Sequence, residues 1–239
     1  MTKINLVGIL RIPCPLECII IERINKFVAK VLIEGKMYRA YINNTGRLLD
    51  CLVRGKKGFC IRTEWTEKTD CRMFSMREDG LGAIVDTQLQ MRAFEKAAQM
   101  KCIPWLGECR VVKRNAKLEE SLIDYLLECG GDRVYLEAKS AVLRGGRYAM
   151  YPDCPSSRGR KHLEELRDHV KRGGRATILF IAALPEVEAF RPNDYGDPDI
   201  PQLLREAYQK GVRVKSIGLY YSPEDSFVYL YNPDLRVEL

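Results

Sequence analysis

Long hydrophobic runs are missing from this 239-residue sequence. The longest ones, at residues 19–21 and 178–184, have the length of a strand, whereas a membrane helix needs roughly 20 consecutive apolar residues. The N-terminus also lacks the apolar core of a secretory signal peptide. We therefore expect no contact with a membrane and a location in the cytoplasm.

Cysteine pairs with metal-binding spacing are also missing. None of the nine cysteines forms a C-x-x-C pair, and the two histidines, His162 and His169, stand far from any cysteine cluster. A structural zinc site normally shows tighter spacing, so zinc is not indicated. Two interpretations remain for the cysteines: buried thiols in a reducing cytosol, or one or two disulfides of the kind found in hyperthermophile cytosolic proteins.

Internal repeats and low-complexity segments are absent, and the length suffices for one large domain or two modest ones. The net charge of +7 is a mild basic excess, which alone says little about a polyanionic partner. The distribution of cations is more informative, because they are dense in residues 54–62 and again in residues 158–175.

The first 79 residues have the pattern of a small all-β domain. Short β-branched or alternating segments predict strands at residues 4–11, 18–24, 27–33, 37–42, 58–63 and 71–77, with a helical patch at 48–52. Several short strands in so few residues favour a small β-barrel of the OB type, and an open sandwich is the alternative.

After a break at residues 79–82 the periodicity changes, and residues 80–239 mix helices with strands. Helices are predicted at residues 87–100, 158–172 and 199–210, the second of them capped by Ser156 or Ser157. Strands are predicted at 111–112, 122–129, 133–142, 177–184, 212–221 and 227–231, with a hairpin turn at Gly130-Gly131. This order predicts an α/β domain, and thus a two-domain fold in which helices flank a mixed sheet.

The hairpin brings three ionisable residues together. If it is symmetric, the numbers of paired residues sum to about 261, so Asp124 lies opposite Glu137, and Lys139 points to the same face. Two adjacent carboxylates suit Mg²⁺ or Mn²⁺, and an ammonium group can balance the charge of a phosphate. A solvated face of weak ion pairs is the alternative. The apolar neighbours of these residues instead indicate central strands, where unpaired charges are rare.

Two further stretches suit a phosphate. Asp153 precedes a helix start, where Arg158 and Arg160 add cations to the favourable end of the helix dipole, followed by Lys161 and His162. A capped, solvent-facing basic helix is the alternative there. The turn containing Asn44 and Arg47 places a cation at the start of the expected helical patch, which also suits a phosphate. A plain structural turn explains these residues equally well.

Four motifs in order resemble the sugar fermentation stimulation protein family, SfsA. They are N-T-G-R-L at residues 44–48, V-D-T-Q-L at 85–89, Asp124 with the E-A-K triplet at 137–139, and the segment at 152–166. The resemblance implies an N-terminal OB-like domain (1–79), a C-terminal domain (80–239) similar to the PD-(D/E)XK restriction-endonuclease fold, and sequence-tolerant DNA binding. The chain departs from the family at Leu122, opposite Lys139 in the hairpin register, where the family usually has arginine.

The resulting hypothesis is a Mg²⁺-dependent (or Mn²⁺-dependent) DNA nuclease. Asp124, Glu137 and the carbonyl of Ala138 are the expected metal ligands, Lys139 assists the water or the phosphate, and Glu95 is a weaker candidate for an extra carboxylate. The residues expected to hold the DNA backbone are Asn44, Arg47, Asp153, Arg158, Arg160, Lys161 and His162.

Two other functions stay open. One is a non-catalytic DNA-binding regulator of sugar metabolism on the same scaffold, with salt-sensitive binding and no cleavage. The other is a single-strand or RNA binder led by the barrel, which would stack bases on aromatic side chains. The expected partner is DNA, as a duplex recognised with low sequence specificity, and a homodimer is an open alternative to a monomer. The aromatic candidates are Tyr38, Tyr41, Phe59 and Trp65.

Overall fold

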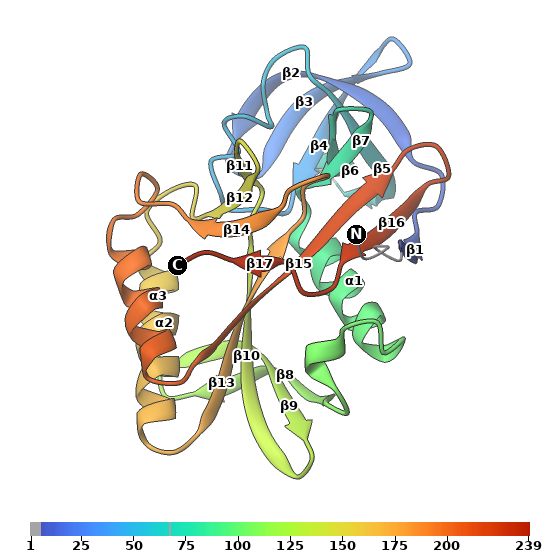
Figure 1. The fold of residues 1–239 in the computed structure, drawn as a ribbon. Coiled ribbons are helices and arrows are strands. Elements are labelled where there is room, and N and C mark those ends of the chain that lie inside the picture. Colours follow the sequence, from blue (N-terminus) through green and yellow to red (C-terminus); the bar gives the residue numbers. More distant parts are fainter. Residues whose placement is uncertain (1–5, 67) are drawn as a thin grey trace.

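The computed structural model describes residues 6–66 and 68–239. Its N-terminal part is a closed barrel of five strands in the order β4-β3-β2-β5-β6, closed by parallel pairing of β4 with β6 (Figure 1). This is the OB-type barrel that the short alternating strands predict, and the open sandwich is excluded. The five strands are β2 (Leu16–Asn25), β3 (Val28–Ile33), β4 (Lys36–Ile42), β5 (Lys57–Thr66) and β6 (Thr69–Glu78).

The helical patch expected at residues 48–52 is wrong, because this segment forms a turn. Leu48 has a left-handed backbone (φ +50°), and its carbonyl accepts hydrogen bonds from the amides of Cys51 (3.1 Å) and Leu52 (2.9 Å). An isolated five-residue apolar segment cannot nucleate a helix of its own. Burial of Leu48 fixes the turn instead.

Strand β1 (Val7–Arg11) lies outside the barrel, although it belongs to the segment 1–79 that the sequence assigns to the barrel domain. It pairs antiparallel with β16 (Phe227–Asn232), with Val7 opposite Leu230. Strand β7 (Leu81–Ile84) occupies the segment where the sequence shows only a break, and it pairs with both β6 and β15 (Arg213–Ser222). The barrel strands and the second sheet are therefore continuous.

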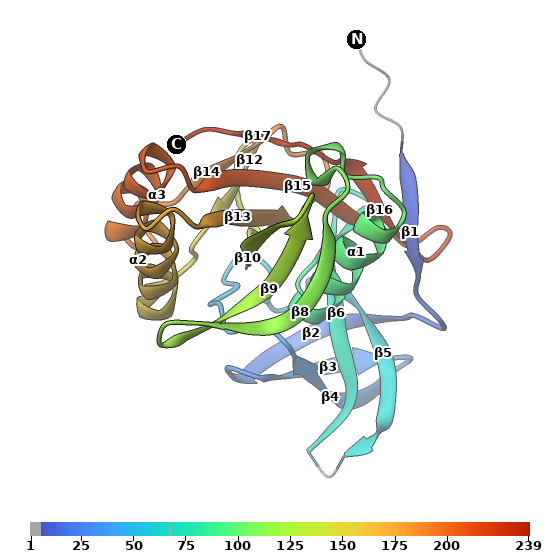
Figure 2. The ribbon, with the colours of Figure 1, turned by 90° about the horizontal axis from the view of Figure 1, so that it is seen from below.

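The second domain is a mixed sheet with helices on both faces, as predicted. Strands β10, β13 and β15 are parallel, and β8 and β9 extend the sheet antiparallel. Helix α1 packs on one face, and α2 and α3 pack together on the other (Figures 1 and 2). The elements introduced here are β8 (Arg110–Leu118), β9 (Ser121–Cys129), β10 (Asp132–Ser140), β13 (Arg175–Ala182), α1 (Thr87–Gln99), α2 (Ser157–Lys171) and α3 (Asp199–Gln209).

A second, small sheet was not foreseen from the sequence. Its strands are two to four residues long, which is too short to show a hydrophobic period. The order is β11-β12-β14-β17, and β12 leads directly into the loop before α2. The strands are β11 (Leu143–Gly145), β12 (Tyr148–Tyr151), β14 (Ala189–Pro192) and β17 (Arg236–Val237), and a short 3₁₀ turn, η1, covers Pro104–Leu106.

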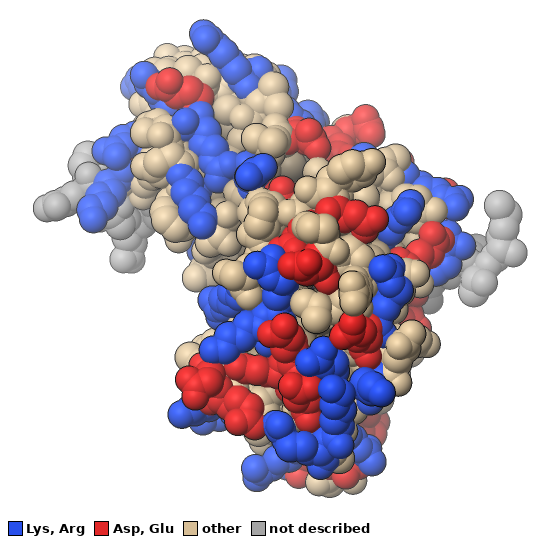
Figure 3. Space-filling view, turned by 90° about the vertical axis from the view of Figure 1, so that its left-hand side faces the viewer, with Lys and Arg blue, Asp and Glu red and all other residues tan. Residues whose placement is uncertain are grey.

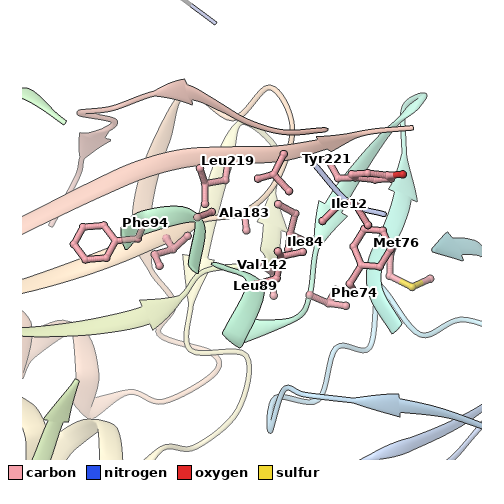
Figure 4. Packing of buried hydrophobic residues seen from close by; sticks show 14 of the residues in the cluster. Ile12, Phe74, Met76, Ile84, Leu89, Phe94, Val142, Ala183, Leu219 and Tyr221 are labelled. Atoms are coloured by element: carbon pink, nitrogen blue, oxygen red, sulfur yellow. The ribbon is translucent and has the colours of Figure 1, made fainter. Parts of the chain in front are cut away.

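One of the two apolar clusters of the described residues crosses from the barrel into the second domain (Figure 4). Tyr221 of β15 meets Phe74 of β6 edge-on at 4.9 Å and Phe59 of β5 at 5.1 Å between ring centroids. Burial of these rings stabilises the contact between the domains, because each aromatic side chain removes a large apolar area from water. The two domains are thus held in one orientation, which fixes any site formed between them.

Two polar caps set the helix starts beside this junction. Asp86 caps α1 by accepting a hydrogen bond from the Leu89 amide at 3.0 Å, and it also pairs with Arg72 of the barrel. Ser156 caps α2 by accepting from the Gly159 amide at 3.1 Å, so the predicted cap is confirmed. Side-chain capping of this kind satisfies amides that have no partner within the helix.

The cysteines adopt both of the arrangements left open by the sequence. Cys109 and Cys129 form a disulfide between the start of β8 and the end of β9. The other seven are free, and Cys18, Cys51, Cys60 and Cys71 among them are buried. None of the helices in the described part of the chain is long and apolar enough to cross a membrane.

Candidate metal and nucleic-acid site

Asp124 and Glu137 meet at the end of the β9–β10 hairpin. The ladder runs from Cys129–Asp132 to Tyr125–Leu136, in the register predicted from the sequence, and Asp124 and Glu137 follow it directly. The Asp124 amide donates to Glu137 Oε2 at 3.1 Å, and the Ala138 amide donates to Asp124 Oδ2 at 2.9 Å. Each carboxylate is therefore oriented by the backbone of the other strand.

Two nitrogens hold the second oxygen of Glu137. Lys139 Nζ lies 2.6 Å and His162 Nδ1 lies 2.5 Å from Glu137 Oε1. The Arg158 Nε–H donates to His162 Nε2 at 3.3 Å, so in a neutral ring the proton sits on Nδ1 and is donated to Glu137. His162 is 2% exposed and thus lies behind Glu137, not on the rim where the sequence placed it.

The protonation states of the cluster follow from burial and neighbouring charge. Burial alone would raise the pKa of Glu137, but the charge of Lys139 and the hydrogen bond from His162 outweigh it and lower this pKa to about 2. Burial opposes the charge on Lys139, but the Glu137 carboxylate outweighs it and raises the pKa of the ammonium. Burial, followed by the charge of Glu137, raises the pKa of Asp124 to about 6.

The cluster lines a cavity of about 360 Å³ at the junction of the two domains, here called the junction cavity. Its walls come from both halves of the chain: the barrel loop at residues 44–46, the start of α1, strand β10, and the loop that joins β12 to α2.

Figure 3 shows one face of the molecule, on which Lys and Arg predominate over the barrel at the top while both signs mix below.

The predicted phosphate-binding residues divide into two groups. Asn44, Asp153 and Arg158 line the junction cavity, and Arg47 lies beside it. Arg160 and Lys161 are not among the residues that line it. Arg160 instead pairs with Asp197 at 2.5 Å, and Lys161 lies 3.8 Å from Glu165.

Asn44 and Asp153 hold the structure around the cavity as well as lining it. The buried Asn44 donates from Nδ2 to the Val85 carbonyl at 3.0 Å and accepts from the Gly46 amide at 2.9 Å. Asp153 Oδ2 accepts from the Leu48 amide at 2.9 Å. Both polar side chains therefore fix the barrel loop that covers the cluster.

Two other expectations at the site are corrected. Glu95 is not near the cluster: it accepts a hydrogen bond from Tyr125 Oη at 2.9 Å, pairs with Arg114 and lines a separate hollow. Leu122 is 52% exposed, and the β9–β10 ladder ends before it could pair with Lys139.

The three aromatic candidates whose side chains the structure describes offer no exposed stack. Phe59 is buried in the shared core, and Tyr38 and Tyr41 are half-buried. The side chain of Trp65 lies outside the described residues.

Sequence reasoning missed Gln90, which lines the cavity from α1. It is 1% exposed, and its Nε2 donates to the Ile84 carbonyl at 2.7 Å and to Ser140 Oγ at 2.9 Å. A buried amide on the apolar face of a helix is the signal that could have found it, because such a group needs partners.

The donor set fits a hard divalent cation. Among the described residues there is no group of three or more His, Cys, Asp and Glu side chains arranged around a metal position. Mg²⁺, however, is usually held by one or two carboxylates together with water and substrate phosphates. Asp124, whose charge is disfavoured by burial and by Glu137, would gain from a cation beside it.

These observations define a two-domain protein in which an OB barrel covers a carboxylate–lysine cluster on a mixed α/β sheet. Family models match both halves: the SfsA N-terminal OB domain at residues 21–85 and the sugar fermentation stimulation protein RE domain at residues 88–225. The chain therefore belongs to the sugar fermentation stimulation protein family, SfsA.

Similar proteins span nearly the whole chain. A sugar fermentation stimulation protein homolog of Pyrococcus furiosus is 44% identical over 222 residues, which are 93% of this chain and 95% of that protein. The homolog of Archaeoglobus fulgidus is 46% identical over 222 residues, 92% and 94% of the two chains. The solved structure of Pyrococcus furiosus SfsA in complex with Ca²⁺ matches with a TM-score of 0.93 at 40% identity, covering 98% of this chain and all of that one.

Proposed function

We propose that this protein binds DNA and hydrolyses its phosphodiester bonds with the help of a divalent cation, Mg²⁺ or Mn²⁺. The observation that carries the proposal is the meeting of Asp124, Glu137 and Lys139 in one cavity between the domains. The similar Pyrococcus furiosus protein was solved in complex with Ca²⁺, which supports divalent-cation binding by this protein. The proposed compartment is the cytoplasm.

The cation would be held by Asp124, Glu137 and the carbonyl of Ala138. When bound, it supplies positive charge to the phosphate and lowers the pKa of a coordinated water. Lys139 stays protonated because Glu137 raises its pKa, so it acts as a donor and a positive charge toward the phosphate, not as a base. His162 and Lys139 together fix the Glu137 carboxylate, and Arg158 adds a second cation at the cavity wall.

The test is incubation of supercoiled and linear DNA with the purified protein in Mg²⁺, Mn²⁺ or EDTA. Asp124→Asn removes a ligand charge but keeps the side-chain shape, and we expect it to lower the cleavage rate by about 10²-fold or more. Glu95→Gln is the matched control, since it makes the same change outside the cavity and should cleave at the wild-type rate. Undiminished cleavage by Asp124→Asn would refute the assignment.

A second candidate is a DNA-binding regulator that does not cleave. The observation in its favour is that no three His, Cys, Asp or Glu side chains of the described residues are grouped as metal ligands, while exposed cations lie beside the cavity. It predicts salt-sensitive DNA binding in EDTA and intact DNA after long incubation with every divalent metal. The same plasmid assay therefore separates the two candidates.

A further inference from the structure

Resting on the proposed function, we propose that the DNA strand entering the junction cavity is unpaired: a single-stranded segment or the overhanging end of a duplex. The duplex expected from the sequence then binds only beside the cavity. Four features of the structure carry this inference: the depth of the cluster, a fixed loop above it, apolar side chains in the cavity lining, and cations on the surface beside it.

The cluster is deep and the space above it is small. Glu137 has a side-chain exposure of 3% and Lys139 of 14%, so a phosphate must enter the cavity to reach them. The cavity volume of about 360 Å³ is at the lower end of the roughly 300–1,000 Å³ that small-molecule sites occupy. It accommodates a ligand of nucleotide size, whereas a double helix has a major groove alone about 12 Å wide.

The roof over the cluster is the barrel loop at residues 44–48, and it is fastened to the second domain. Asp153 Oδ2 of the second domain accepts from the Leu48 amide at 2.9 Å, and within the barrel Arg23 donates to the Gly46 carbonyl at 3.0 Å. Gly46 packs so closely that a Cβ atom there would lie 2.5 Å from Asp153 Oδ2. The loop therefore confines the cavity in the folded protein and does not leave room for a duplex.

Apolar side chains also line the junction cavity. They come from α1, β13 and the segment around β11 and β12. An apolar surface beside a phosphate site suits the flat face of a base, and only an unpaired or extruded base can present that face. The residues are Met91, Leu143 and Met150, together with the buried Val142 and Ile181.

Cations lead from the surface of the barrel into the junction cavity. A shallow second hollow, here called the outer hollow, shares Lys26, Thr45 and Gly46 with the cavity and is also lined by Arg23 and Arg47. Lys26 and Arg47 form no salt bridge with any residue in the described part of the chain. A positively charged groove that continues into a nucleotide-sized cavity is the arrangement by which proteins follow a single-stranded backbone.

The binding test compares one fluorescent oligonucleotide of about 20 nucleotides, longer than the roughly 4–16 that an OB fold covers, as a single strand and as a blunt duplex. Ca²⁺ is used to hold the site without turnover, and fluorescence anisotropy reports the Kd. We expect the single strand to bind at least about tenfold more tightly, the effect of stacking one base at about 1–3 kcal/mol. Equal or tighter binding of the duplex would overturn the inference.

Variants then test the path of the strand. Lys26→Ala/Arg47→Ala should weaken single-strand binding and make the slope of log K against log salt shallower by about 1.4, because each lost phosphate contact removes about 0.7. Lys171→Ala/Arg172→Ala removes the same charge from the end of α2, outside both hollows, and should leave the affinity and the slope nearly unchanged. The same loss in both double variants would overturn the proposed path.

A cleavage assay separates this inference from the proposed function. On a duplex with a single-stranded overhang in Mg²⁺ or Mn²⁺, products should map to the overhang, and equal cutting within the paired region would overturn the inference. If no substrate is cut, the proposed hydrolysis fails, and the single-strand preference is judged by anisotropy alone.

Discussion

Asp153 and Leu48, which are 105 positions apart in the sequence, are joined by a hydrogen bond of 2.9 Å from the Leu48 amide to Asp153 Oδ2. The bond ties the barrel loop to the loop before α2. Sequence reasoning assigned Asp153 to phosphate binding, but a carboxylate beside a phosphate would be repelled by it. In the structure this carboxylate instead closes the junction cavity by binding a backbone amide.

The contact between Gly46 and Asp153 predicts a coupled pair of substitutions. Gly46→Ala alone should destabilise the protein, because the new Cβ would lie 2.5 Å from Asp153 Oδ2. In an Asp153→Ala background the obstacle is gone, and the same change should be neutral or stabilising by about 0.4–1 kcal/mol. Urea unfolding of the four proteins measures the coupling, which we expect to exceed about 1 kcal/mol. Additive effects would contradict the close approach.

Removal of the charge of Asp124 should increase the stability of the folded protein. Its pKa is raised from 3.8 to about 6, so the charged form is disfavoured in the folded protein, and stability falls as pH rises from about 4 to 6. In EDTA at pH 8, Asp124→Asn should be more stable by up to about 3 kcal/mol, and the gain should vanish below pH 4. Thermal unfolding across pH measures this. Glu95→Gln, with the same chemical change elsewhere, should show no such gain at pH 8.

A divalent cation should make the wild type more stable than Asp124→Asn. A cation bound by Asp124 stabilises only the folded wild type, so adding Mg²⁺ or Ca²⁺ should raise the Tm of the wild type and leave that of Asp124→Asn nearly unchanged. An equal rise in both proteins would show that the cation binds elsewhere.

The pairing of Glu137 with Lys139 predicts that Glu137→Gln is harmful to the fold. Both side chains are buried, so removing one charge leaves the other without its partner, at a cost of about 3–5 kcal/mol. Glu137→Gln/Lys139→Met removes both charges and should recover most of that loss. Chemical unfolding at neutral pH measures the difference. If the double variant is no more stable than Glu137→Gln, the ion pair is not the cause.

Reduction of the disulfide predicts a loss of stability without a loss of the site. Cys109 and Cys129 close a loop of 20 residues, for which about 3 kcal/mol is expected. Cys109→Ser/Cys129→Ser should lower the Tm, and reducing agent should then have no further effect on it. Cys14→Ser, at an exposed free cysteine outside the cavity, should keep the wild-type response to reducing agent. Metal affinity below the Tm should be unchanged in both variants, because Asp124 lies away from the disulfide end of β9.

The sequence predicted those parts of the molecule that depend on patterns of neighbouring residues. The hairpin register followed from Gly130-Gly131 and placed Asp124 next to Glu137, and the caps and apolar stripes located all three α-helices. The sequence did not predict features that depend on contacts between residues far apart in the chain. The position of His162 behind Glu137 requires α2 to pack on β13, and the partner of Glu95 is a tyrosine 30 residues away.

Pairing choices were also beyond the sequence. Strand β1 has the same alternating pattern as the barrel strands, so nothing local shows that its partner is β16. Strands β11, β12, β14 and β17 are too short to carry a period, although β11 and β12 contribute Leu143 and Met150 to the lining of the junction cavity.

The pairing of β1 with β16 has a consequence for synthesis on the ribosome. Val7 leaves the exit tunnel early, but its partner Leu230 is made only after more than two hundred further residues. The barrel has all five of its strands once residue 78 has emerged, whereas the strand that precedes it must wait, unpaired, for nearly the whole chain. The pairing of β1 is therefore a late step of synthesis, and a nascent chain that stops short of β16 carries a free edge that the folded molecule does not.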